Sequence, residues 1–283
     1  MPRSSLSLDF PQATQAQLAA LTQNILDNDE INLEAYCPTN PAPDFTEEEL
    51  ADCYRLAWQL LTSGMSISST RRLVFTIAIR RSATPEQALS FKLMRARFKK
   101  MRFACANYSE QHAPPERLHS ITRLMGVFQD AYKSGQNLRT FWFGIKLWCR
   151  LRSDFFEELR EILVKAGLST VESFQRYIAT EDQHLVAAVQ ENPLLTARRF
   201  HELRKVISRR IALNDTRRAL HPTPELDAVS RFLATINGLM GGMHDDLVLK
   251  KTRNELDYDN ELFKLPDEIA GRIRAWVTTQ GSL

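Results

Sequence analysis

Helix start signals recur along this chain, whereas the alternation of apolar and polar residues that marks a strand is nearly absent. Thr46 is followed three residues later by Glu49, which is the pattern of a capping box. Thr84 and Thr223 each precede a proline at the first helical position, where a missing amide hydrogen is not needed. The longest β-branched stretch, residues 71–81, is short and also fits a buried turn of helix. The sequence therefore predicts an all-α protein with long helices.

Length, charge and cysteine use narrow the class of protein. The 283 residues can bury a substantial core, and the net charge of +3 is only mildly basic. No apolar segment of a signal peptide begins the chain, and no run approaches the roughly 18 apolar residues of a membrane span. The cysteines are far apart and form no CxxC pair, which argues against a zinc site or a disulfide framework; they are Cys37, Cys53, Cys105 and Cys149. We therefore expect a cytoplasmic protein with no membrane span, no metal and no cofactor.

Positive charge is concentrated in residues 92–102, where six side chains are Lys or Arg and no acidic residue lies between Glu86 and Glu110. On a helix, Phe91, Met94, Phe98 and Met101 form an apolar stripe. The cations on the opposite arc are Lys92, Arg95, Lys99, Lys100 and Arg102. Solvated helix faces usually mix acidic with basic residues, because like charges repel at this spacing. Uncompensated charge on this scale predicts an anionic partner.

A second segment has the same design. From Arg198 to Arg218 there are eight Lys or Arg residues against two acidic ones. Its apolar stripe is Phe200, Leu203, Ile207 and Ile211, and the other side carries His201, Arg204, Lys205 and Arg209. The two basic segments therefore look like two copies of one element.

The same short motif follows each basic segment. Leu-Met-Gly ends at Gly126 and again at Gly241, and an aspartate stands four residues later, at Asp130 and Asp245. A basic helix followed twice by this motif indicates an internal duplication. Glycine costs about 1 kcal/mol in a helix relative to alanine, so we expect each one to permit close approach to the basic helix.

The predicted organisation follows from the duplication. It comprises an N-terminal extension, partly helical or disordered, at 1–45; a first helical repeat at 46–140; a linker helix and second repeat at 141–265; and a C-terminal helix at 266–283. The aromatic stretch 141–152 is interpreted as a buried linker helix, with a membrane-surface helix as the alternative.

The two motifs resemble those of the CHAD family, the conserved histidine α-helical domains, over roughly residues 70–255. In the second half, the matching residues are His201, Arg204, Lys205, Arg209, Gly241, His244, Asp245 and Val248. In the first half, Lys92 stands in place of the histidine and Gln129 in place of a basic residue, while the residues in register are Arg95, Lys99, Lys100, Arg102, Gly126 and Asp130. The second half departs from the pattern at Ser208 and Ile211, and Arg210 projects toward the apolar side.

The resemblance implies two pseudo-symmetric four-helix bundles around a basic central channel that binds inorganic polyphosphate, in some members on polyphosphate granules. The implied ligand-binding residues are Lys92, Arg95, Lys99, Lys100, Arg102, His201, Arg204, Lys205, Arg209 and His244. Gly126, Asp130, Gly241 and Asp245 would support them. Nearby phosphates should raise the pKa of both histidines, so binding should strengthen below pH 7.

Three other functions remain open at this stage. Catalysis at phosphate would need clustered carboxylates or an activated nucleophile, but the motif aspartates fit a role of pairing with Arg, so we expect no enzyme. Nonspecific nucleic-acid binding would use the same basic helices, although Phe98 and Phe200 lie on apolar stripes rather than among the cations. A helical scaffold that docks an acidic protein is the third alternative.

Overall fold

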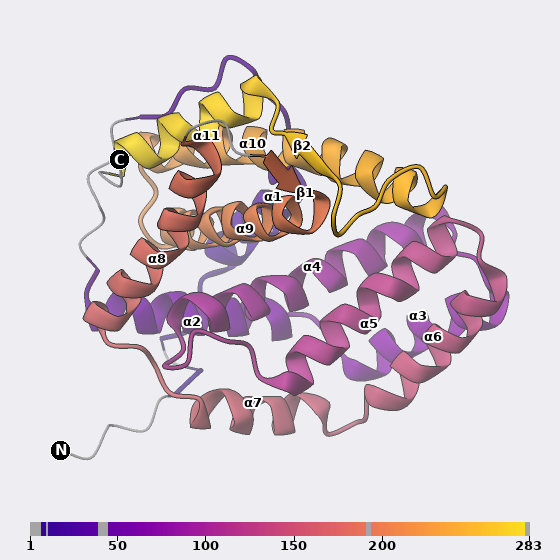
Figure 1. Cartoon of the computed structure of the whole chain (residues 1–283). Coiled ribbons are helices and arrows are strands. Elements are labelled where there is room, and N and C mark those ends of the chain that lie inside the picture. Colours follow the sequence, from indigo (N-terminus) through magenta and orange to yellow (C-terminus); the bar gives the residue numbers. More distant parts are fainter. Residues whose placement is uncertain (1–6, 10, 39–44, 191–193, 281–283) are drawn as a thin grey trace. The chain divides into compact units, whose positions relative to one another are not determined.

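The protein consists almost entirely of helices, as predicted (Figure 1). The computed structural model describes residues 7–9, 11–38, 45–190 and 194–280. These ranges contain eleven helices and one two-stranded sheet. None of the helices in these ranges combines the length and the hydrophobicity needed to cross a membrane. The chain forms two compact units: unit 1 contains residues 1–22 and 47–170, and unit 2 contains residues 23–46 and 171–283.

Unit 1 is built around one long basic helix. Its helices are α2 (Glu47–Thr62), α3 (Ile67–Arg80), α4 (Pro85–Tyr108), α5 (Glu116–Lys133), α6 (Asn137–Arg150) and α7 (Phe155–Lys165). The basic helix α4 packs against α2, α3 and α5, and α6 packs against α3 and α5. The predicted helix start at Thr84 is confirmed, and it forms a capping box: Gln87 N donates to the Thr84 hydroxyl at 3.3 Å, and Thr84 N donates to Gln87 Oε1 at 3.1 Å.

Unit 2 is built around a long helical hairpin. Its elements are α8 (Val171–Val189), β1 (Leu194–Thr196), α9 (Ala197–Leu220), α10 (Pro224–Thr252), β2 (Leu262–Lys264) and α11 (Asp267–Thr279). The helix α9 packs along α10, and α8 packs against α9 and α11. The strands pair antiparallel, with Leu195 opposite Phe263. The Thr223 hydroxyl caps α10 by accepting from Leu226 N at 3.2 Å, as its Thr-Pro sequence predicts.

The segment 23–46 belongs to unit 2, although it precedes unit 1 in the sequence. The helix α1 (Gln15–Asp27) begins in unit 1 and ends in unit 2. Beyond α1, Asn32 N donates to the Thr235 hydroxyl at 3.1 Å. Phe45 then meets the edge of Phe174 at 4.7 Å between ring centroids. Part of the expected N-terminal extension thus packs into unit 2.

The boundary between the units differs from the expected one. We expected residues 141–265 to form a linker helix and the second repeat, whereas α6 and α7 belong to unit 1, and the boundary follows Thr170. Each basic helix still lies in a unit of its own. The arrangement of these units as symmetric four-helix bundles around a channel stays a prediction.

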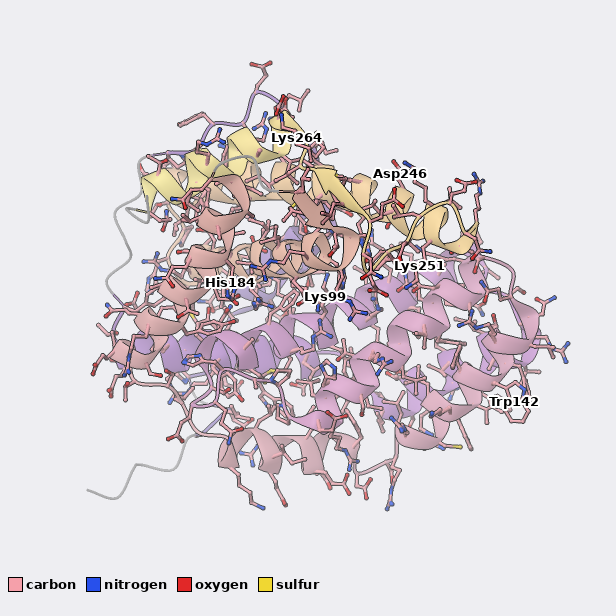
Figure 2. All side chains as sticks on the ribbon, in the orientation of Figure 1. Lys99, Trp142, His184, Asp246, Lys251 and Lys264 are labelled. Carbon is pink, nitrogen blue, oxygen red and sulfur yellow. The ribbon has the colours of Figure 1, made fainter. Side chains whose placement is uncertain are left out.

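The helix α6 is less buried than the sequence predicted. Thr140, Gly144 and Leu147 are buried, because they face α3 and α5. Trp142 lies on the other side of the helix and is 67% exposed (Figure 2). The interpretation of this stretch as a buried linker helix is therefore wrong for its outward side.

Candidate functional site

The two basic helices have the same local setting in their respective units. Each is 24 residues long, and each packs against the helix that carries the Leu-Met-Gly motif: α4 against α5 and α9 against α10. The motif helices thus bring their glycine and aspartate to the basic helix that precedes them. This pairing is repeated once per unit, as the duplicated motifs predict.

An arginine side chain lies against the motif glycine in both units. A Cβ atom added to Gly126 would lie 3.1 Å from Arg95 Nη2, and one added to Gly241 would lie 3.0 Å from Arg204 Nη2. The glycines therefore make room for the end of a guanidinium group rather than for the backbone of the neighbouring helix. The agreement between the two distances shows that the same contact is made twice.

Arg95 is held by several groups of α5. Its Nη1 donates to Gln129 Oε1 at 3.4 Å. Burial lowers the pKa of the guanidinium, while the negative charge of Asp130 raises it. Arg95 Nε is buried without a hydrogen-bond partner among the residues that the structure describes. The side chain is thus fixed in place with part of its donor capacity unused.

Arg204 has equivalent surroundings in unit 2. Burial lowers the pKa of this guanidinium, and the carboxylates of Asp245 and Asp29 raise it. Its Nε is likewise buried with no partner in the described part of the chain. Asp29 belongs to the N-terminal segment, which the sequence motifs did not connect with this arginine. The motif aspartates therefore act electrostatically on the motif arginines in both units.

Two histidines stack beside Arg204. The rings of His201, on α9, and His244, on α10, lie 4.6 Å apart at an angle of 22°. Burial lowers the pKa of His201 to about 4, and the nearby His244 and Lys205 contribute to the shift. Without a bound anion, His201 is therefore neutral near pH 7. The charge that we expected from it would require an anion that raises this pKa.

The remaining cations predicted on α4 fall into different environments. Lys92 is exposed one turn before Arg95. Lys99 Nζ and the Arg102 guanidinium carbon lie over the ring of Phe103, at 5.3 and 5.7 Å from its centroid. The helical wheel placed Lys100 on an exposed basic arc, but its side chain is only 7% exposed.

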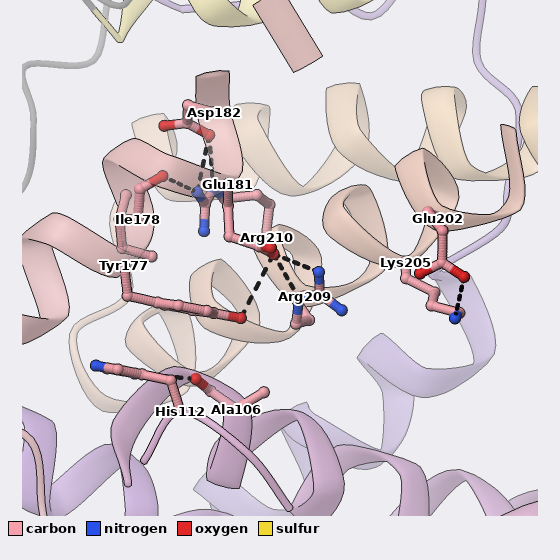
Figure 3. A network of polar contacts seen from close by, with 10 residues as sticks. All are labelled: Ala106, His112, Tyr177, Ile178, Glu181, Asp182, Glu202, Lys205, Arg209 and Arg210. Carbon is pink, nitrogen blue, oxygen red and sulfur yellow. Dashed lines mark hydrogen bonds and ion pairs between the residues drawn. The ribbon is translucent and has the colours of Figure 1, made fainter. Parts of the chain in front are cut away.

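Acidic residues neutralise part of the basic face of α9. Arg209 Nε donates to Glu181 Oε2, on α8, at 2.7 Å, and the Tyr177 hydroxyl donates to the same carboxylate (Figure 3). Lys205 pairs with Glu202 at 2.6 Å one turn earlier on its own helix. Arg209 thus fits a structural role better than the ligand-binding role implied by the resemblance.

Ser208, which departs from the family pattern, and the nearby Arg210 both make structural contacts. The Ser208 hydroxyl donates to Asn237 Oδ1, on α10, at 3.1 Å. Arg210 is buried, and its Nη2 donates to Asp182 at 2.8 Å and to the Ile178 carbonyl at 2.7 Å (Figure 3). Arg210 therefore does not replace the missing cation at position 208. Sequence reasoning missed Glu181 and Asp182 because they lie 28 residues before their partners.

The candidate residues that the structure brings together form two sets. In unit 1 they are Arg95 beside Gly126, Gln129 and Asp130, with Lys92 exposed one turn earlier on the same helix. In unit 2 they are His201, Arg204 and Lys205 beside Gly241, His244 and Asp245. Within the described ranges, His, Cys, Asp and Glu form no group of three or more that could hold a metal ion.

A comparison with known proteins found no matching family model, no matching curated protein and no matching solved structure. The arguments for function therefore come from the residues themselves.

Proposed function

We propose that this chain is a divergent CHAD-like protein that binds inorganic polyphosphate, or a similar linear polyanion, without catalysing a reaction on it. Arg95 and Arg204 are the principal contacts, with Lys92, Lys205 and the His201–His244 pair beside them. Binding of this kind would place the protein on polyphosphate granules.

The placement of one arginine on one glycine in each unit carries the proposal. A guanidinium forms forked hydrogen bonds with phosphate oxygens, and a side chain already held in place loses less conformational entropy on binding. A linear polymer with a charge on every phosphate offers equivalent oxygens to both arginines. Two copies of one cationic contact suit such a repetitive ligand.

Burial of the aromatic side chains favours polyphosphate over single-stranded nucleic acid. Phe98 and Phe200 are fully buried, and Phe103 lies beneath the cations of α4 rather than open to a base. Stacking on exposed aromatic rings supplies much of the affinity for single strands. Polyphosphate requires no such stacking.

A salt-dependent titration tests the proposal. Long-chain polyphosphate would be titrated into the wild-type protein and into Arg95→Ala and Arg204→Ala variants, with single-stranded and duplex DNA of equal charge as competitors. We expect each substitution to weaken binding roughly tenfold or more, because each removes a charge-assisted hydrogen bond. The slope of log affinity against log salt should become shallower by about 0.7 for each phosphate that the variant no longer neutralises, as it does for single strands.

The matched controls are Lys165→Ala and Arg176→Ala, which remove exposed cations from α7 and α8. They change the net charge equally and should leave polyphosphate affinity nearly unchanged. Equal weakening of binding in all four variants would reduce the site to a generic basic surface. Full displacement by DNA would favour a nucleic-acid ligand.

A further inference from the structure

The helices α3 and α6 form a layer of unit 1 that lacks acidic residues. No Asp or Glu occurs in residues 67–85 or 134–153. The cations in these segments are Arg71, Arg72, Arg80, Arg81, Arg139, Lys146, Arg150 and Arg152. This layer is separate from the arginine–glycine contacts described above, because those contacts join α4 to α5 and α9 to α10. Arg152 pairs with Asp154, just beyond the second segment, at 3.2 Å. The other cations have no acidic residue on α3 or α6, and this excess of positive charge favours an anionic partner.

A glycine fixes the two helices against each other. A Cβ atom added to Gly144, on α6, would collide with Ala78 of α3 and would lie 2.7 Å from the ring of Phe128 on α5. The two helices therefore form one rigid platform, and they run side by side in Figure 1. A rigid platform presents its outward side chains in a fixed pattern.

Large apolar side chains project from this platform. On α6, Leu138 and Trp142 are 69% and 67% exposed, and on α3, Phe75 and Ile79 are 43% and 50% exposed. Figure 2 shows Trp142 at the edge of the unit. Leu138 and Trp142 are four residues apart, as are Phe75 and Ile79, so each pair shares one side of its helix. Exposed apolar side chains are common singly, but four on two adjoining helices mark an interaction surface.

Cations and aromatic rings alternate along the same helices. The Arg71 guanidinium carbon lies 4.2 Å from the centroid of Trp148, and the Arg139 guanidinium carbon lies 5.5 Å from that of Phe143. An open groove of about 490 Å³ between α3 and the C-terminal end of α6 is lined by Arg71, Arg72, Trp148, Ser68 and Ser153, among others. Such a groove offers charge and hydrogen-bond donors to a phosphate-sized group.

We propose that the α3–α6 face docks on the surface of an anionic lipid bilayer. Trp142 and Leu138 enter the boundary between head groups and acyl chains, while the surrounding cations contact lipid phosphates, with Arg72 at the groove. This combination of indole, aliphatic and cationic side chains is typical of helices that lie in a membrane interface. Nucleic acid would match the charge and the rings, but it would leave the aliphatic side chains Leu138 and Ile79 without a suitable environment.

Vesicle flotation tests this proposal on the full chain. We expect binding to vesicles of equal parts phosphatidylserine and phosphatidylcholine, and little binding to phosphatidylcholine alone. Removing one arginine, as in Arg72→Gln, should weaken vesicle binding about fivefold. Trp142→Ala should weaken it roughly tenfold, because it removes a large apolar side chain from the interface.

Matched controls separate this face from general charge and hydrophobicity. Tyr36→Ala removes an aromatic ring that is 69% exposed in unit 2, and Arg176→Gln removes an exposed cation there. Both should leave vesicle affinity unchanged. Trp58 and Trp276 are buried, and the Arg71 guanidinium lies over the ring of Trp148 in the groove. Trp142 fluorescence should therefore shift to the blue on vesicle binding, and Trp142→Phe should reduce that shift, leaving the contribution of Trp148, while the variant still floats.

Three outcomes would overturn the proposal. The first is flotation that is equal with neutral and anionic vesicles or unaffected by the Trp142 and Arg72 variants. The second is an absence of flotation together with duplex DNA binding that depends on Arg72, which would assign the face to nucleic acid. The third is a dimer, detected by light scattering, that Trp142→Ala dissociates, which would assign the face to a second copy of the chain.

Discussion

At the scale of single residues, the contact between an arginine and a glycine is the most informative feature of this protein. Arg95 and Arg204 lie where any larger residue at Gly126 or Gly241 would crowd the guanidinium group. The obstruction is modest, because the end of a flexible side chain can move by a few tenths of an ångström. These glycines thus control the position of the arginines more than they control the packing of the helices.

Alanine substitutions at glycine separate these two roles. Gly126→Ala and Gly241→Ala should leave the free energy of unfolding unchanged or slightly higher, because alanine favours helix, while displacing the arginine and weakening polyphosphate binding several-fold. Gly242→Ala, where a Cβ meets nothing within 4 Å, should stabilise by about 1 kcal/mol without altering binding. Gly144→Ala should destabilise by about 1–3 kcal/mol through overpacking. Urea denaturation measures the free energy of unfolding, and titration measures polyphosphate affinity. Unchanged binding in Gly126→Ala and Gly241→Ala would contradict the proposed role of the two arginines.

The pKa of His201 gives a pH dependence that can be measured without any ligand. Its folded-state value of about 4 lies below the unfolded value near 6.5, so the unfolded state binds more protons between these pH values. Stability should therefore be full above pH 6.5 and should fall as the pH decreases toward 4. His201→Gln should flatten this part of the profile. Imidazole NMR signals follow the titration directly, and a midpoint near 6.5 in the free protein would refute the assignment.

At the scale of elements, α8 and α9 are joined by two adjacent ion pairs. The pair between Arg210 and Asp182 is almost fully buried, with side chains 3% and 5% exposed. Removing one partner from such a pair leaves an uncompensated charge in the interior, whereas replacing both with apolar residues of similar size is far less costly. The pair thus fixes the register of α8 on α9.

A double-mutant cycle tests this arrangement. Arg210→Met or Asp182→Leu alone should lower the free energy of unfolding by about 3–5 kcal/mol, and the double variant should lose much less than the sum. The exposed pair of Lys165 with Glu161, at 3.9 Å, is the control and should show a coupling of about 0–1 kcal/mol. Additive effects at Arg210 and Asp182 would mean that the two side chains act independently.

The same elements show what the sequence can and cannot predict. Helix starts at Thr84 and Thr223 were predictable, because a cap depends on residues within one turn. The neutralisation of Arg209 by Glu181 was not, because counting charge within a window ignores acidic residues from another helix. The exposure of Trp142 was missed for a related reason: periodicity defines the sides of a helix, but only its neighbours decide which side is covered.

At the scale of the whole molecule, residues that are neighbours in the sequence belong to different structural units. Phe45 lies two residues before α2 of unit 1, yet it packs in unit 2 against Phe174, with the Arg217 guanidinium carbon 4.7 Å from its ring centroid. The two basic helices that the duplicated motifs singled out lie in separate units. The motifs could not locate this segment, which carries neither of them.

Hydrogen exchange tests the membership of this segment. Phe45→Ala should destabilise unit 2 by about 3–5 kcal/mol, because the ring is buried and would leave a cavity. Amide exchange should accelerate in α8–α10 and remain unchanged in α4 and α5. Phe91→Ala, a comparable truncation in the core of unit 1, should produce the reverse pattern. Equal acceleration in both units after either change would mean that the chain unfolds as one cooperative body.

Unit 2 combines an early and a late segment of the chain, which has a consequence for synthesis on the ribosome. Asn32 bonds to Thr235, 203 residues further along the chain. At ordinary rates of translation, the early segment waits on the order of ten to forty seconds for its partner to be made. During that interval the residues 47–170 of unit 1 are translated, while Asn32 still lacks its hydrogen-bond partner on α10. The nascent chain must therefore hold an unfinished segment of one unit beside a completed stretch of the other.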